Sequence, residues 1–261
     1  MSNQTFTPDK IRELCRQQKL TTPTPGLALG FVQANLIVLP FASAWEFLLF
    51  CQRNPKPCPI LDVTDMGNPE AKHIAPRSDI RMDLPRYKVF RHGELTAEVN
   101  DIREYWQDDL VGFLIGCSFS FENAMLNCGL PLRHIEEQKN VSMYKTNIKC
   151  IASKAFTSNL VVSMRPIPSH QVVRAVEITT RYYKAHGSPI HIGNPKAIGI
   201  ENLDCPDYGD AVTIKAGEVP VFWACGVTTQ LAVENAKPEL AITHSPGHMF
   251  VSDMNDEELT F

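Results

Sequence analysis

Two short apolar runs each lead into a cysteine-bearing turn, and this repeated arrangement constrains the fold more than any other feature of the sequence. Leu110–Gly116 is followed by Cys-Ser-Phe-Ser, and residues 219–224 are followed by Cys-Gly-Val-Thr. Apolar runs of this length predict buried strands, and the hydroxyl residues beyond them predict helix N-caps at Ser118 or Ser120 and at Thr228. Strand, turn and helix in succession indicate an α/β fold.

Residues 132–188 have a different pattern, in which two strands are followed by one helix without the signature of a parallel sheet. A chain of 261 residues accommodates one large domain or two small ones. We therefore predict a three-layer α/β/α main domain, built from residues 1–131 plus 189–261, with a smaller inserted two-layer α+β domain at 132–188. The acidic residues 255–261 are expected to fray.

The charge balance favours a small-molecule partner. Lys and Arg number 25 against 29 Asp and Glu, a net charge of −4, so the basic excess of a nucleic-acid binder is absent. The first ten residues, MSNQTFTPDK, show no basic and apolar leader, and the longest nearly apolar stretch is too short to span a bilayer. We expect a cytoplasmic protein that binds neither nucleic acid nor membrane and keeps its cysteines reduced.

The chain lacks the sequence motifs of the common cofactors. None of the eight cysteines forms a CxxC pair, which argues against the usual zinc and iron–sulfur frames. The motifs GxGxxG, GxxxxGKS/T and GxSxG are also missing, so dinucleotide, P-loop and nucleophile-elbow chemistry lack support. We expect no metal and no cofactor.

The two cysteine-bearing turns are the candidate site. Helix N-termini at the ends of strands offer N–H groups to a carboxylate substrate, and the same position favours a thiolate at Cys117 and Cys225. Both cysteines could equally be small packing residues of the core. Glu122, one turn into its helix, is a further candidate proton carrier. The substrate-binding candidates from these turns are Ser118, Ser120 and Thr228.

Four polar residues elsewhere complete the set of substrate-binding candidates. Gln33 and Asn35 interrupt an apolar run and form either the polar edge of a pocket or an amide pair that bonds a neighbouring loop. Arg165 could clamp a carboxylate through two hydrogen bonds or be an ordinary surface arginine. His244 lies four residues before a second histidine, but the Pro-Gly between them excludes a helical metal pair and favours a hydrogen-bonding role.

Several separated motifs extend in a fixed order from Pro25 to Asp253. They are PGLALGFVQANLIVLP, GCSFSFE, MRPIP, HGSPIHIGNPKAIGI, PDYGD, EVPVFWACGVTTQ and ITHSPGHMFVSD. Together they resemble the D-glutamate cyclase family, whose bacterial members commonly carry the name "putative hydro-lyase". The resemblance implies a three-layer α/β domain with a smaller two-layer domain. It also implies conversion of D-glutamate to 5-oxo-D-proline and water, and it transfers no catalytic residue.

Ring closure of this kind requires an amine that loses a proton, a general acid on the leaving oxygen and donors for the oxyanion. A thioester on either cysteine is disfavoured, because forming it from a free carboxylate without ATP is uphill. Two alternatives stay open. Cys117 and Cys225 could act as the two bases of an amino-acid epimerase, or the protein could be a non-catalytic carboxylate-binding or partner module. An exposed strand edge in the small domain would suit a homodimer.

Overall fold

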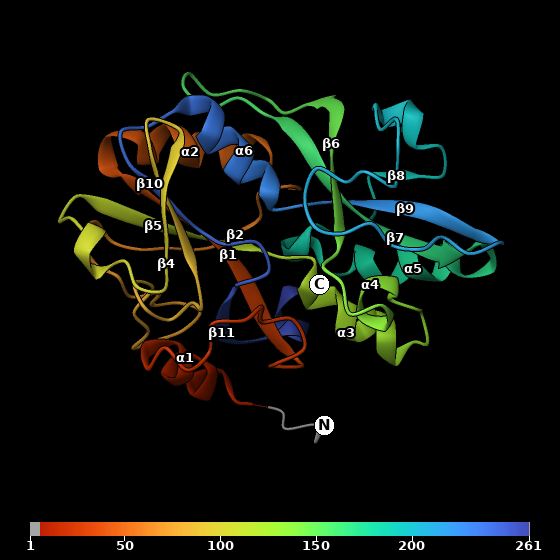
Figure 1. The fold of residues 1–261 in the computed structure, drawn as a ribbon, viewed down its shortest axis with the longest axis horizontal. Helices are drawn as coiled ribbons and strands as arrows, with labels where there is room; N and C mark the ends of the chain where they lie inside the picture. The colour runs from red at the N-terminus through yellow and green to blue at the C-terminus, as the bar shows by residue number, and fades with distance from the viewer. Residues whose placement is uncertain (1–5, 261) are drawn as a thin grey trace.

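The computed structural model describes residues 6–260, which form two antiparallel sheets with helices packed against them (Figure 1). The helices are α1 (Pro8–Arg16), α2 (Phe41–Arg53), α3 (Phe119–Asn127), α4 (Arg133–Glu136), α5 (Val172–Thr180) and α6 (Val227–Ala236). The strands are β1 (Phe31–Pro40), β2 (Ile60–Val63), β3 (Tyr87–Arg91), β4 (Glu94–Val99), β5 (Leu110–Gly116), β6 (Ser142–Lys149), β7 (Asn159–Pro168), β8 (His191–Ile192), β9 (Glu218–Ala224), β10 (Ala241–His244) and β11 (Phe250–Asn255). Short 3-10 turns lie between them at η1 (Arg103–Tyr105), η2 (Ser169–Gln171), η3 (Tyr183–Ala185), η4 (Pro195–Ile198) and η5 (Asp256–Leu259).

The larger sheet is organised around β1. Its order is β2-β5-β1-β10-β3-β4, and β11 pairs with the first part of β1 beside β10. Helices α2 and α6 cover one face, where the rings of Phe47 and Phe113 meet edge to face at 4.9 Å. The irregular segment 71–84 covers the other face through Ala71 and Ile80. Burial on both faces explains why β1 is almost continuously apolar.

The smaller sheet has the order β6-β7-β9-β8. Helices α3 and α5 cover one face, with Phe121 and Ala175 packed against Trp223. Strands β8 and β9 fall within 189–261, the range that we assigned to the main domain, so this sheet takes strands from both sides of the predicted boundary. The division into two domains therefore stays a prediction.

The mixed α/β class is confirmed, whereas the three-layer arrangement stays a prediction. Every strand pairing within residues 6–260 is antiparallel. The Thr7 hydroxyl accepts a hydrogen bond from the Lys10 N–H and so caps the start of α1. The single helix expected within 132–188 is α5, which ends at Thr180; the 3-10 turn η3 and a left-handed residue at His186 follow it. None of the helices in this part of the chain has the length and apolar run needed to cross a membrane.

Each cysteine-bearing turn carries the chain from one sheet to the other. β5 belongs to the larger sheet, but α3 after it packs on the smaller one. β9 belongs to the smaller sheet, but α6 after it packs beside α2 on the larger one (Figure 1). Cys117 and Cys225 stand at these two crossings. The reciprocal exchange brings two turns that are far apart in sequence to the seam between the sheets.

Gly116 is the last residue of β5, directly before the crossing at Cys117. Its replacement tests how tightly this crossing is packed. A Cβ at this position would lie 2.1 Å from the backbone oxygen of Lys184, which no side-chain rotation can relieve. We expect Gly116→Ala to lower the free energy of unfolding by about 3 kcal/mol, measured by urea denaturation. Gly217→Ala is the control, because no atom lies within 4 Å of its added Cβ and only the positive φ of 83° opposes it. Equal losses in the two variants would contradict this account.

Candidate active site

Both crossing cysteines line one small cavity of about 20 Å³ at the seam between the sheets. The cavity brings together five of the residues predicted from the sequence, namely Asn35, Cys117, Ser118, Cys225 and His244. The rest of its wall consists of Phe119, Asn140, Val141, Met143, Val227, Pro246, Gly247 and Met249. A volume of this size holds about one water molecule. This cavity is the candidate active site.

Asn35 fixes the two cysteine-bearing turns relative to each other. Its Nδ2 donates hydrogen bonds to the carbonyl oxygens of Ile115 (3.2 Å) and Gly116 (3.0 Å), at the end of β5. On the other side, a Cβ added to Gly226 would lie 2.3 Å from the same nitrogen. The amide is therefore held between the residue before Cys117 and the residue after Cys225. This contact explains the glycine in the second turn.

The two thiols are protonated at neutral pH. Burial raises the pKa of Cys117 to about 12 and that of Cys225 to about 11. The N–H groups of Phe119 and Val227 and the charge of Arg165 act in the opposite direction, but they are outweighed. The thiolate tendency expected at a helix N-terminus is thus overcome, because a desolvated sulfur disfavours charge more than the helix favours it.

His244 contributes a neutral ring to the cavity wall. Burial lowers its pKa to about 4, so the imidazole carries no charge near neutral pH. Its Nδ1 lies 3.2 Å from the Leu36 N–H and 3.4 Å from the Gln230 amide nitrogen, against one acceptor, the Leu36 oxygen, at 3.4 Å. The two donors favour an unprotonated Nδ1, with the proton on Nε2. The Gln230 side chain donates to the His244 carbonyl at 3.2 Å and holds the residue in place. His244 can therefore act as a neutral hydrogen-bond donor.

A fully buried ion pair lies next to the cavity. The Arg165 guanidinium donates to Glu122 from Nε at 2.9 Å, and also to the hydroxyls of Ser118 and Ser163, each at 3.0 Å. His134 approaches the same Glu122 carboxylate at 3.2 Å. Burial alone would raise the pKa of Glu122, but the charges and hydrogen bonds of Arg165 and His134 lower it overall. Glu122 is therefore ionised and Arg165 is already paired.

The remaining predicted residues lie outside this cavity. Gln33 faces a second cavity, which Glu122 also lines, and exchanges hydrogen bonds with Thr24. The Thr228 hydroxyl bonds the Val161 N–H at 3.0 Å and so links α6 to β7 instead of capping α6. The Ser120 hydroxyl is buried and has no hydrogen-bond partner among residues 6–260. Their predicted substrate contacts, and the predicted clamp by Arg165, stay predictions.

Sequence reasoning did not single out His134 or the Asn140 and Met143 part of the cavity wall. The Met143 sulfur lies 3.6 Å from the Cys225 sulfur, and His134 contacts the Glu122 carboxylate that Arg165 also binds. Both reach the site from chain segments that follow α3. Met143 reaches the site through the antiparallel pairing of β6 with β7, and His134 through α4, so no local spacing in the sequence indicates either residue.

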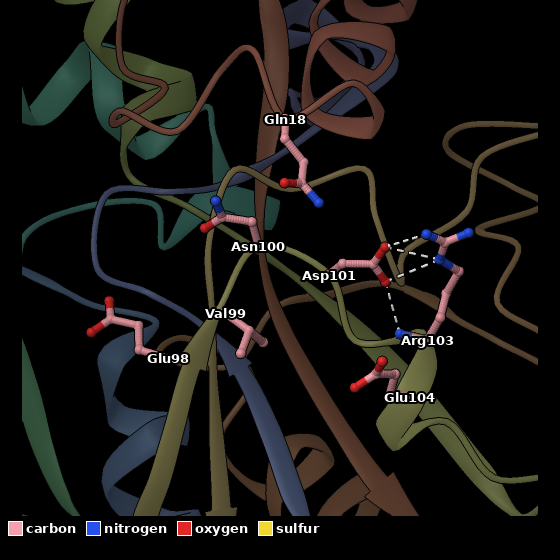
Figure 2. A pocket seen from close by; sticks show the side chains of 7 residues that line it. All are labelled: Gln18, Glu98, Val99, Asn100, Asp101, Arg103 and Glu104. Atoms are coloured by element: carbon pink, nitrogen blue, oxygen red, sulfur yellow. Dashed lines mark hydrogen bonds and ion pairs between the residues drawn. The ribbon is translucent and has the colours of Figure 1, made fainter.

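A much larger hollow on the described surface is unrelated to these residues. It has a volume of about 780 Å³ and lies at the end of β4 (Figure 2). Its lining residues are Gln18, Glu98, Val99, Asn100, Asp101, Arg103 and Glu104. Arg103 pairs with Asp101 at 2.6 Å, so no free cation faces a carboxylate substrate there (Figure 2). Across residues 6–260 no group of three His, Cys, Asp or Glu side chains is placed to hold a metal ion.

The buried ion pair makes a specific prediction for stability. Arg165→Met leaves Glu122 without its main partner and should lower the free energy of unfolding by about 3–5 kcal/mol. The double variant Arg165→Met/Glu122→Gln removes the unpaired charge and should recover much of that loss in urea denaturation. Arg174→Met is the matched control on an exposed position and should change stability by less than about 0.5 kcal/mol.

The same pair predicts a pH dependence. The pKa of Glu122 is lowered in the folded state, so its contribution to the free energy of unfolding is complete above the ordinary carboxyl pKa of 4.5. That contribution is lost as the pH falls through the lowered value.

The variants test the pairing itself. If Arg165→Met/Glu122→Gln lost as much free energy of unfolding as its two single variants together, the pairing would be contradicted.

Comparison with known proteins places the chain in a family. The D-glutamate cyclase family profile matches residues 111–253. A Bacillus licheniformis protein named "Putative hydro-lyase" is 60% identical over 96% of both chains, and "Putative hydro-lyase YcsI" of Bacillus subtilis is 58% identical over 97% of this chain and 98% of its own. A solved nitrogen repressor-like protein from Methanococcus jannaschii aligns over 93% of this chain and 94% of its own, with a TM-score of 0.39 and 10% identity. The chain belongs to the D-glutamate cyclase family, as its motifs predicted.

Proposed function

We propose that this protein is a hydro-lyase that cyclises D-glutamate to 5-oxo-D-proline with loss of water, at the cavity between Cys117 and Cys225. The observation that carries the proposal is that two thiols from separate sheet crossings line one cavity with a neutral histidine. Membership of the D-glutamate cyclase family and the names of the bacterial relatives support the reaction class.

The proton balance of the reaction suits protonated thiols. The ammonium nitrogen loses two protons when it forms the lactam C–N bond, and the carboxylate oxygen that leaves as water gains two. The reaction needs no net acid or base, only groups that relay protons between nitrogen and oxygen. Cys117 and Cys225 would each give a proton to one atom and receive one from the other. His244 Nε2 would donate a hydrogen bond to the oxygen that departs.

The negative charge that develops on the attacked carboxyl group needs fixed donors. The first N–H groups of α3 and α6 have no acceptor within their own helices, and those of Phe119 and Val227 point at the two sulfurs. The Arg165 charge lies close enough to lower the pKa of both thiols, although Glu122 pairs with it. Arg165 would thus be a positioning and electrostatic residue that does not touch the substrate.

Substrate binding must widen the cavity, because its present volume is far smaller than an amino acid. Part of the wall is the turn between β10 and β11, with Pro246 and Gly247. Thr24 holds this turn against the chain before β1. Its N–H and its hydroxyl both donate to the Gly247 oxygen, at 2.9 and 3.2 Å, and its hydroxyl accepts from the Met249 N–H at 3.0 Å. We expect this turn to move outward when the substrate enters.

The test is a direct assay with D-glutamate, L-glutamate and both 5-oxoprolines, followed by chiral chromatography. Ring closure or opening confined to the D series is expected. Cys117→Ala and Cys225→Ala should each lower kcat at least about 100-fold, because each removes a proton carrier. Cys205→Ala, at an exposed cysteine, is the matched control and should leave kcat unchanged. Full activity in both cavity variants would contradict the proposed roles.

The two-cysteine epimerase is the second candidate, since thiols on one cavity could remove and return the α-proton. Deuterium incorporation from D₂O distinguishes the epimerase from the cyclase. In D₂O an epimerase places deuterium on the α-carbon of recovered glutamate, whereas cyclisation never breaks that C–H bond. Deuterium on the α-carbon would therefore overturn the cyclase in favour of the epimerase. Binding of D-glutamate without turnover would instead favour the carboxylate-binding module.

A further inference from the structure

Asp256 is a buried carboxylate that the proposed reaction does not use. It begins η5, in a segment that we expected to fray, but its N–H donates to the Gly30 oxygen at 2.9 Å and Asn255 and Glu258 form a capping box. Its side chain is 6% exposed, and its Oδ1 accepts no hydrogen bond from any residue in the range 6–260. An unpaired buried carboxylate is costly unless a ligand supplies the missing donor.

This carboxylate borders a cavity of about 120 Å³ between the loop before β1 and helix α3. Most of the wall is apolar, and three of its side chains stand out at the surface although they are large hydrophobic residues. They are Leu29 (51% exposed), Leu126 (41%) and Ile135 (45%). Exposed apolar side chains around a hollow are typical of a ligand-binding site. The ligand should therefore have an apolar part.

The charges of the cavity select the polar part of the ligand. Glu122 also lines it, but the Arg165 guanidinium already pairs with that carboxylate. No lysine or arginine is among the described lining residues, so an acidic ligand would find no counter-ion. The other oxygen-bearing side chains of the wall are Gln33, Glu122 and Asn123. Gln33 is hydrogen-bonded to Thr24 and Glu122 to Arg165, so these two are already engaged and a metal ion would gain little from them. A compact cation with hydrogen-bond donors and a short carbon chain satisfies both the carboxylate and the walls.

We propose that this cavity binds a small primary alkylammonium, with the Asp256 carboxylate as its counter-ion and the side chains of Leu29, Leu126 and Ile135 around its carbon chain. The site adjoins the thiol cavity, because Phe119 lines both, but its walls are otherwise different. The proposal therefore stands whether or not the protein cyclises D-glutamate.

The site should respond to pH. Burial raises the pKa of Asp256 to about 7, so the carboxylate needed for binding forms between about pH 6 and 8. The other ionisable groups around it are Glu122, Cys128, Tyr182, Glu257 and Glu258. Glu122 is already ionised, and burial raises the pKa of Tyr182, with Asp256 and Glu257 adding to the effect, so that it stays neutral in this range. Binding should therefore strengthen from pH 6 to pH 8.

Isothermal titration of the whole protein with n-butylammonium chloride at pH 8 and constant ionic strength tests the proposal. We expect saturable binding at one site, and no binding of butanol or butyrate. Asp256→Asn keeps the shape but removes the charge, and should weaken the affinity at least about tenfold. Glu257→Gln is the matched control at the exposed neighbouring carboxylate and should bind as the wild type does.

A second variant leaves Asp256 intact. Leu126→Trp narrows the cavity from a half-exposed position that tolerates a larger side chain, and should weaken butylammonium binding with little loss of stability. Equal affinity in the wild type and Asp256→Asn would overturn the proposal, as would the absence of saturable binding to the folded wild type. Potassium chloride that competes as strongly as the amine would also overturn it, in favour of a metal-ion site.

Discussion

The relative position of the two thiols depends on the buried contact between Arg165 and Glu122. Arg165 lies on β7 of the smaller sheet, and Glu122 lies on the helix that follows Cys117 out of the larger sheet. Burying either charge alone would be strongly unfavourable, so the pair fixes α3 against β7. The Arg165 guanidinium also donates a hydrogen bond to the hydroxyl of Ser118, the residue after Cys117. Chemistry at the cavity is thus coupled to the packing of the sheets.

Two opposing effects set the state of the thiols, and their magnitudes decide the chemistry. Helix N-termini and the nearby Arg165 charge favour thiolates, whereas removal from water favours thiols. Burial is the larger effect at both cysteines. The cavity is therefore suited to relaying protons between two atoms of a substrate, and poorly suited to nucleophilic attack by a sulfur anion.

Local features of the fold were predictable and long-range ones were not. The apolar runs and turns predict β5, β9 and the helices after them, because these features depend on neighbouring residues. Nothing local indicates that the chain changes sheet at Cys117 and Cys225, nor that β9 joins β7. Arg165 and Glu122 were both named as candidates, but their pairing was not predicted, since it follows from the packing of α3 against β7. Asp256 was missed because it lies in an acidic terminal segment, and such segments are usually exposed to solvent.

The protonation state of Cys117 and Cys225 tests the central claim most directly. It can be measured as the thiolate absorbance near 240 nm during a pH titration. The comparison is between the wild type and Cys117→Ala/Cys225→Ala, so that the other cysteines cancel. The account predicts no difference between the two proteins up to about pH 9, because burial holds the two pKa values at about 12 and about 11. A step in the difference between pH 6 and 8 would reveal a thiolate and contradict the proposed proton relay.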